Sequence, residues 1–177
     1  MIYLPNGSNV LVRRPGILPA GIRFFMRDHF NHTEKIVHKD GGIYTFGAVK
    51  DGCIYRPLEK AIKDEKWKRI EVWQPKFNFP DEQLIAICDR FEGTPYQKIN
   101  FVQWLIFLRY GKWLGKSSTR RMYCYELTAR ICEELLHGTF PKGHFIERTH
   151  IKQFRNLDAY ELYGVFDVSA GKLKNIS

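Results

Sequence analysis

The sequence has no long hydrophobic run. Its first 16 residues, MIYLPNGSNVLVRRPG, contain no apolar stretch of signal-peptide length, and the most apolar segment, residues 101–108, is too short to span a bilayer. These absences argue against a secreted or membrane-spanning protein. The default expectation is a soluble, cytoplasmic protein.

Paired cysteines are also missing. The chain has four cysteines, with no C-x-x-C pair and no regular spacing among them: Cys53, Cys88, Cys124 and Cys132. This pattern argues against both a zinc knuckle and a disulfide framework. The prediction is four reduced thiols, with no metal and no cofactor.

Acidic residues are outnumbered by basic ones. There are 19 Asp and Glu against 28 Lys and Arg, a formal net charge of +9. Such a charge favours nucleic acid, anionic lipid or an acidic polymer such as cell-wall glycan-peptide as a partner. The basic residues are dispersed and form no recognisable nucleic-acid-reading motif, so nucleic acid ranks last. The oligomeric state is left open.

Repeats, low-complexity segments and long Gly/Ser linkers are absent as well. With 177 residues and 44% hydrophobic content, the chain can bury one substantial core, which predicts a single domain over residues 1–177. Residue alternation and turn signals predict strands at 9–13, 33–37, 43–49, 53–56, 69–73 and 160–168. Start and stop signals predict helices at 81–91, 97–110 and 122–137. Early strands, a central helical block and a closing strand indicate an α+β fold.

Cys124 stands at the start of the last predicted helix. Free cysteine usually behaves as a small buried hydrophobe, and position alone favours that inert interpretation. A helix N-terminus stabilises a thiolate, however, and Arg120 and Arg121 precede Cys124 directly, so the position also suits a nucleophile. The residue also belongs to an apolar stripe at helical spacing: Cys124, Leu127, Ile131 and Leu135.

A nucleophilic thiol needs a base, and histidine is the usual one. His32 begins the predicted strand HTEKIV, where the backbone could hold an imidazole rigidly against a helix end. A solvated surface role is favoured for His137, His144 and His150. Spacing alone places His32 only slightly ahead of the remaining histidines.

Several short stretches, taken in order, resemble the permuted NlpC/P60-type cysteine hydrolases of the YiiX/YebB-like group. That group typically reads G-D-I-L, then S-H-V-G-I-V, then E-A followed by G-V and P-L, then G-x-x-Y-D, and finally C-S-E-L. The corresponding stretches here are GSNVL (7–11), NHTEKIV (31–37), GA (47–48) through PL (57–58), GTPYQ (93–97) and CYEL (124–127). The resemblance covers roughly residues 7 to 136.

The resemblance implies a circularly permuted papain-like fold, with an antiparallel sheet or small barrel packed against a helical half. It assigns Cys124 as the nucleophile and His32 as the general base of a thiol amidase or peptidase. The implied reaction forms a thioester acyl-enzyme. The implied substrate is an amide bond of a cell-wall-type peptide.

Two departures weaken the match. Gly47 stands where relatives carry glutamate, and Gln97 stands where they carry aspartate. Neither substitute holds a negative charge, so an orienting role on His32 is either vacant or taken by Thr45 or Gln97. Tyr96 matches the family tyrosine and is a candidate to line the site or to hydrogen-bond within it, as a third or oxyanion residue together with Thr45 and Gln97. A core-edge tyrosine that bonds to the backbone is the equally supported alternative.

Two other functions stay open. Some permuted relatives act on lipids. Residues 101–116 form an apolar stretch that is followed by aromatic and basic residues, which would suit a lipid acyl hydrolase or acyltransferase. A buried core helix explains that stretch better, so membrane contact is not favoured. The third hypothesis is a catalytically impaired family member that acts as a binding module. The uncharged Gly47 and Gln97, which replace the acidic residues of the family, support this hypothesis.

Overall fold

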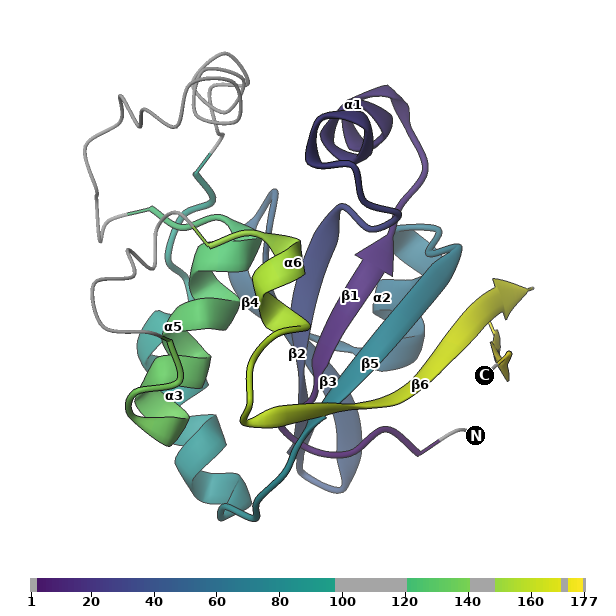
Figure 1. Ribbon diagram of the computed structural model, residues 1–177. Helices are drawn as coiled ribbons and strands as arrows, with labels where there is room; N and C mark the ends of the chain where they lie inside the picture. Colours follow the sequence, from purple (N-terminus) through teal and green to yellow (C-terminus); the bar gives the residue numbers. More distant parts are fainter. Residues whose placement is uncertain (1–2, 98–120, 141–148, 170–171, 177) are drawn as a thin grey trace.

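The computed structural model describes residues 3–97, 121–140, 149–169 and 172–176. A seven-stranded antiparallel sheet runs through this part of the chain in the order β4-β3-β2-β1-β5-β6-β7 (Figure 1). The sheet confirms the α+β class and all six predicted strands. Their observed bounds are β1 Asn9–Arg13, β2 His32–Lys39, β3 Gly42–Val49, β4 Gly52–Pro57, β5 Arg69–Pro75 and β6 Tyr160–Ser169; β7, Lys172–Asn175, was not predicted.

The hairpin between β2 and β3 follows from its turn residues. Asp40 and Gly41 both have positive φ, 51° and 73°. A two-residue turn with positive φ at both positions matches the right-handed twist of paired strands, and Asp-Gly adopts it readily. The turn fixes the register in which Lys39 faces Gly42 and Lys35 faces Phe46. One residue further along, the same register places Glu34 of β2 opposite Gly47 of β3.

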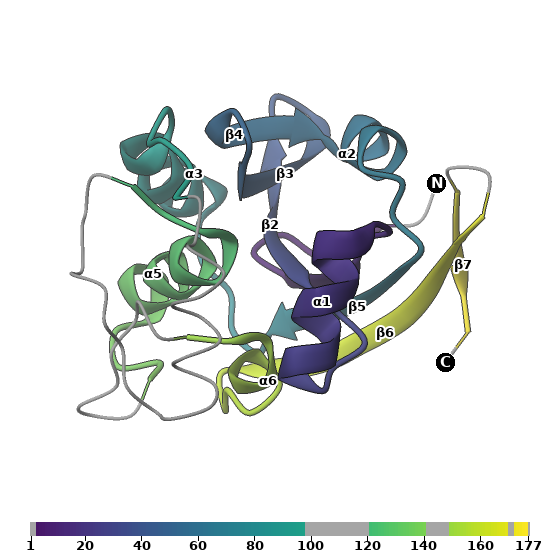
Figure 2. The ribbon, with the colours of Figure 1, turned by 90° about the horizontal axis from the view of Figure 1, so that it is seen from above.

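Helices cover both faces of the sheet (Figure 2). On one face, α3 (Asp81–Phe91) and α5 (Cys124–Leu136) pack against Val37, Phe46 and Ala48 of β2 and β3. On the other face, α2 (Leu58–Asp64) packs against Val10, Ile36 and Val72. Because side chains alternate along a strand, neighbouring residues of the central strands enter different cores.

The helix predictions have mixed outcomes. The helix predicted over 81–91 is confirmed as α3, and the one predicted over 122–137 is confirmed as α5 with slightly narrower bounds. Beyond Gln97, the helix predicted over 97–110 lies outside the described residues. Three described helices were not among those predicted: α1, Ile17–Met26, α2, and the short α6, Ile151–Phe154. Among the described helices, none combines the length and apolar character needed to cross a membrane.

Arg155 ties α6 to the sheet and to the turn before β2. Its guanidinium donates to both carboxylate oxygens of Glu71 on β5, at 2.8 to 3.1 Å, and to Asp28 at 2.6 Å. Asp28 in turn accepts the backbone N–H of Phe30, at 3.0 Å. Burial disfavours a charged Arg155, but the two carboxylates outweigh it and raise the pKa of the guanidinium. Arg155 therefore fixes the approach of the chain to β2.

We expect Arg155→Met to destabilise the fold by about 3 kcal/mol, because it leaves two poorly solvated carboxylates without their cation. Denaturant unfolding followed by circular dichroism measures the change. Arg90→Met is the matched control, since the exposed ion pair of Arg90 with Glu134 is worth less than about 1 kcal/mol. Equal losses in the two variants would contradict a special role for Arg155.

Candidate active site

Cys124 is the first residue of α5, at the same end of the sheet at which β2 begins (Figure 1). Its side chain is only 6% exposed. Burial raises the pKa of the Cys124 thiol to about 11, although the charge of Arg14 and the backbone N–H groups of Thr33 and Tyr125 oppose that rise. The resting thiol is therefore protonated at neutral pH.

A cation that was not predicted acts on Cys124. That influence was expected from Arg120 and Arg121; Arg120 lies outside the described residues, and Arg121 is exposed. Arg14, which follows β1, is the cation that favours the thiolate form of Cys124 here. The backbone N–H of Thr33 at the sulfur also places Cys124 beside the start of β2, one residue from His32.

His32 is the first residue of β2 and is 3% exposed. Its Nε2 lies 2.9 Å from Oε1 of Glu34. Residues i and i+2 of a strand project from the same face, which explains how one strand supplies both side chains. Burial, assisted by the charge of Arg14, lowers the pKa of His32 to about 4, despite the opposing effect of Glu34. The resting imidazole is therefore neutral.

Glu34 is fully buried and is the centre of an ion-pair network. Burial alone would raise its pKa, but the hydrogen bond and charge of His32, followed by the charges of Arg56 and Arg14, hold that pKa well below its usual range. Arg14 and Arg56 both also pair with Glu65. We call these four residues, Arg14, Glu34, Arg56 and Glu65, the Glu34 network. Its two guanidinium groups and two carboxylates balance in charge.

Gly47 makes room for Glu34. It lies opposite Glu34 on β3, one step beyond the pair Lys35–Phe46. A Cβ at position 47 would lie 2.7 Å from Cγ of Glu34 and 3.0 Å from its Cδ. The carboxylate that Gly47 cannot provide therefore enters the same space from the neighbouring strand. The orienting role was predicted to be vacant or taken by Thr45 or Gln97, and Glu34 was not predicted, although its i+2 spacing from His32 was the available signal.

The other predicted site residues are Tyr96, Gln97 and Thr45, and none of them is a described hydrogen-bond partner of His32. Tyr96 forms an isolated bridge with Met122 and packs in the same cluster as Cys124. Burial raises the pKa of Tyr96, and the charge of Cys124 adds to the rise. The backbone N–H of Gln97 donates to Met122, at 2.8 Å. Thr45 is buried on β3 opposite Ile36, and its hydroxyl is not among the hydrogen-bond partners of His32.

All four cysteines are free and buried in the structure. Cys132 lies two turns along α5 from Cys124, where Nζ of Lys35 approaches its sulfur at 3.3 Å. Cys88, on α3, and Cys53, on β4, lie in the core cluster between helices α3 and α5 and the sheet. Burial raises the pKa of each of these last two thiols to about 12. Cys124 differs from both because backbone N–H groups, those of Thr33 and Tyr125, favour its thiolate form.

Comparison with known proteins identifies the fold but no family. No protein family model matches the chain, and no curated protein matches it. The chain is similar to the crystal structure of metalloprotein yiiX from Escherichia coli O157:H7 (DUF1105), with 18% sequence identity and a TM-score of 0.57. The alignment covers 98% of this chain and 97% of that chain. The likeness shows a YiiX-like α+β fold over nearly the whole length.

That neighbour is described as a metalloprotein, which raises the question whether the described residues of this chain could hold a metal ion. Among the described residues, His32, Glu34 and Glu65 bring one ligand atom each within 4.8 Å of one another. Both carboxylates already pair with Arg14 and Arg56, and Nε2 of His32 bonds to Glu34. A divalent cation at this point would face two guanidinium charges at contact distance. The arrangement therefore does not fit a metal, and arginine supplies the positive charge instead.

We expect Gly47→Ala to destabilise the fold by about 1–3 kcal/mol, because the new Cβ displaces a Glu34 side chain that the network holds in place. Denaturant unfolding measures the loss. In a Glu34→Ala background the same substitution meets open space, so its cost should nearly vanish. A double-mutant cycle isolates this coupling. If Gly47→Ala lowers the free energy of unfolding by the same amount in both backgrounds, contact with Glu34 is not the reason that position 47 needs glycine.

Proposed function

We propose that this protein is a cysteine hydrolase with a circularly permuted papain-like fold of the NlpC/P60 type. Cys124 acts as nucleophile, His32 as general base and Glu34 as the residue that orients His32. The observation that carries the proposal is the buried, charged carboxylate on Nε2 of His32. The YiiX-like fold and the order of histidine before cysteine along the chain support it.

The protonation states assign the role of each ring nitrogen. Because Glu34 is a carboxylate, it can only accept, so Nε2 of His32 carries a proton and donates it. A neutral imidazole has one N–H, which leaves Nδ1 with a lone pair. That lone pair is the group that would accept a proton from Cys124. Glu34 also favours the imidazolium that this transfer creates.

The proposed reaction starts from a protonated Cys124 thiol and a neutral His32 imidazole. The proton of Cys124 moves to Nδ1 of His32 as the sulfur attacks a carbonyl carbon, and Arg14 stabilises the developing thiolate. The imidazolium then returns this proton to the leaving amine or alcohol, and a thioester remains on Cys124. Water, deprotonated by His32, attacks the thioester and releases the acid.

The N-terminal end of α5 provides the groups that would hold the oxyanion. Helix α5 begins at Cys124 without a side-chain cap hydrogen bond, and the backbone N–H groups of a first turn point out of the N-terminal end of a helix. They carry the positive end of the helix dipole toward the carbonyl that Cys124 attacks. Tyr96, beside Met122, is proposed to line the acyl site.

Two substrate classes are compatible with this chemistry. An amide bond of a cell-wall-type peptide is the first, from the resemblance to NlpC/P60 enzymes. A lipid acyl ester or amide is the second, favoured by the exposed apolar surface of α1 beside the cluster that contains Cys124. A non-catalytic binding module has less support, because a fold kept only for binding does not require a charged orienter on His32.

Incubation with p-nitrophenyl acetate should acylate Cys124, detected as an acetylated species by intact-mass spectrometry and located by peptide mapping. An activated ester is chosen because its good leaving group makes acylation independent of the natural substrate. His32→Ala should slow acylation by about 10²–10⁴-fold, the usual contribution of a general base. Cys124→Ala should abolish it.

Cys88→Ala is the matched control, since Cys88 is another buried thiol of the core; it should acylate like the wild type. Melting curves of each variant establish that it is folded. Acylation on lysine or Cys88 in place of Cys124, or an unchanged rate in a folded His32→Ala variant, would overturn the proposed mechanism.

A further inference from the structure

Helix α1 exposes apolar side chains on its outer side. Ile17 is 95% exposed and Phe24 is 77% exposed, the two highest values among the exposed large hydrophobic residues of the described chain. Together with the exposed Ala20, they fall at i, i+3 and i+7, which places them on one side of the helix. We call Ile17, Ala20 and Phe24 the α1 stripe. Large apolar side chains gathered on one exposed side mark an interaction surface.

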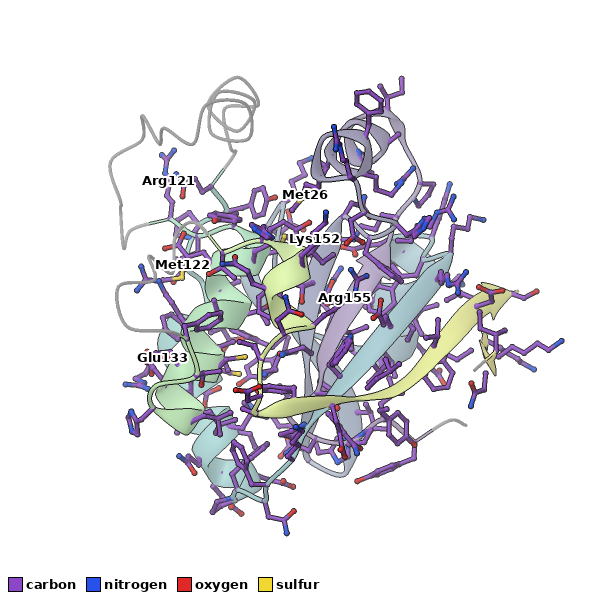
Figure 3. All side chains as sticks on the ribbon, in the orientation of Figure 1. Met26, Arg121, Met122, Glu133, Lys152 and Arg155 are labelled. Atoms are coloured by element: carbon purple, nitrogen blue, oxygen red, sulfur yellow. The ribbon has the colours of Figure 1, made fainter. Side chains whose placement is uncertain are left out.

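The inner side of α1 is fixed to the rest of the protein. Met26 is buried, and both Met26 and Ile22 pack in the cluster that contains Cys124 and Tyr125. Figure 3 shows Met26 beneath α1, on the side that faces α5 and α6. The α1 stripe is therefore the outer surface of an anchored helix, and it lies at the end of the molecule that carries the candidate site (Figures 1 and 2).

The charged residues of the segment that carries the α1 stripe all have one sign. Residues 13–27, RRPGILPAGIRFFMR, contain four arginines and no acidic residue. Arg14 turns inward to the Glu34 network, but Arg13 and Arg27 are exposed. Arg23, between them, donates to the backbone carbonyl of Arg14, at 2.7 Å. Exposed apolar residues flanked by uncompensated arginines are the pattern of a helix that lies on an anionic membrane surface.

We propose that α1 docks this protein on anionic phospholipid, with Ile17 and Phe24 in the acyl boundary and Arg13 and Arg27 at the headgroups. The absence of acidic residues over the whole segment favours lipid phosphates over a mixed-charge protein surface. Docking in this way holds the end of the sheet with Cys124 and His32 against the bilayer. The inference rests on α1 alone and not on the proposed chemistry, so either can fail without the other.

Co-sedimentation of the full chain with vesicles tests the docking. The protein should bind vesicles of phosphatidylcholine mixed with phosphatidylglycerol, bind phosphatidylcholine vesicles weakly, and lose affinity as salt rises. Ile17→Ser with Phe24→Ser should weaken binding to the mixed vesicles by about tenfold or more. Arg13→Gln with Arg27→Gln should weaken it and flatten the salt dependence.

Phe77→Ser with Leu162→Ser is the matched control, because it removes two other exposed apolar side chains, 42% and 47% exposed; it should bind like the wild type. Acylation by p-nitrophenyl acetate, a soluble reagent, should be unchanged in the Ile17→Ser, Phe24→Ser variant, which separates docking from chemistry. No binding to mixed vesicles, or equal loss in the control, overturns the proposal. Self-association of the wild type that depends on concentration and disappears in the Ile17→Ser, Phe24→Ser variant also overturns the docking proposal. A second copy of the chain would then cover the α1 stripe.

Discussion

The site depends on one buried hydrogen bond, from Nε2 of His32 to the carboxylate of Glu34. A carboxylate without exposed surface is costly unless cations and donors surround it, and the fold brings Arg14 from the end of β1 and Arg56 from the end of β4 to that point. Glu65, from the end of α2, balances their charge. Four segments of the chain thus meet at the residue that fixes the tautomer of His32. The same arrangement leaves Nδ1 of His32 with its lone pair, and this is the nitrogen that we propose as the base.

The local patterns of the sequence predicted much of the fold. Alternating apolar residues located all six of the predicted strands, and the Asp40-Gly41 turn set the β2–β3 register. Helix α1 was missed because Pro19 and Gly21 are poor helix formers and its apolar residues face both the core and the exterior. Its stability comes from packing of Ile22 and Met26 on the cluster around Cys124, which no local pattern encodes.

The candidate site was predicted in part, for a similar reason. A cysteine at a helix start and a histidine at a strand start are local signals, and the structure places these two segments side by side. The orienting role on His32 was predicted to be vacant or taken by Thr45 or Gln97, because Gly47 stands where the resembled family carries glutamate. Only the cross-strand register shows that a side chain at Gly47 and the side chain of Glu34 compete for one space. Arg14 and Arg56, which make a buried Glu34 tolerable, are 42 positions apart in the sequence (56 − 14).

The most direct test of this account is the ionisation and tautomer of His32, read from ¹⁵N chemical shifts of histidine-labelled protein across a pH series and assigned with His32→Gln. The account predicts a neutral ring at pH 7 with its proton on Nε2, which becomes charged only as the pH falls toward its pKa of about 4. A proton on Nδ1 of the neutral ring, or an imidazolium already present at pH 7, would contradict the assignment of Glu34 as the residue that orients His32 toward Cys124.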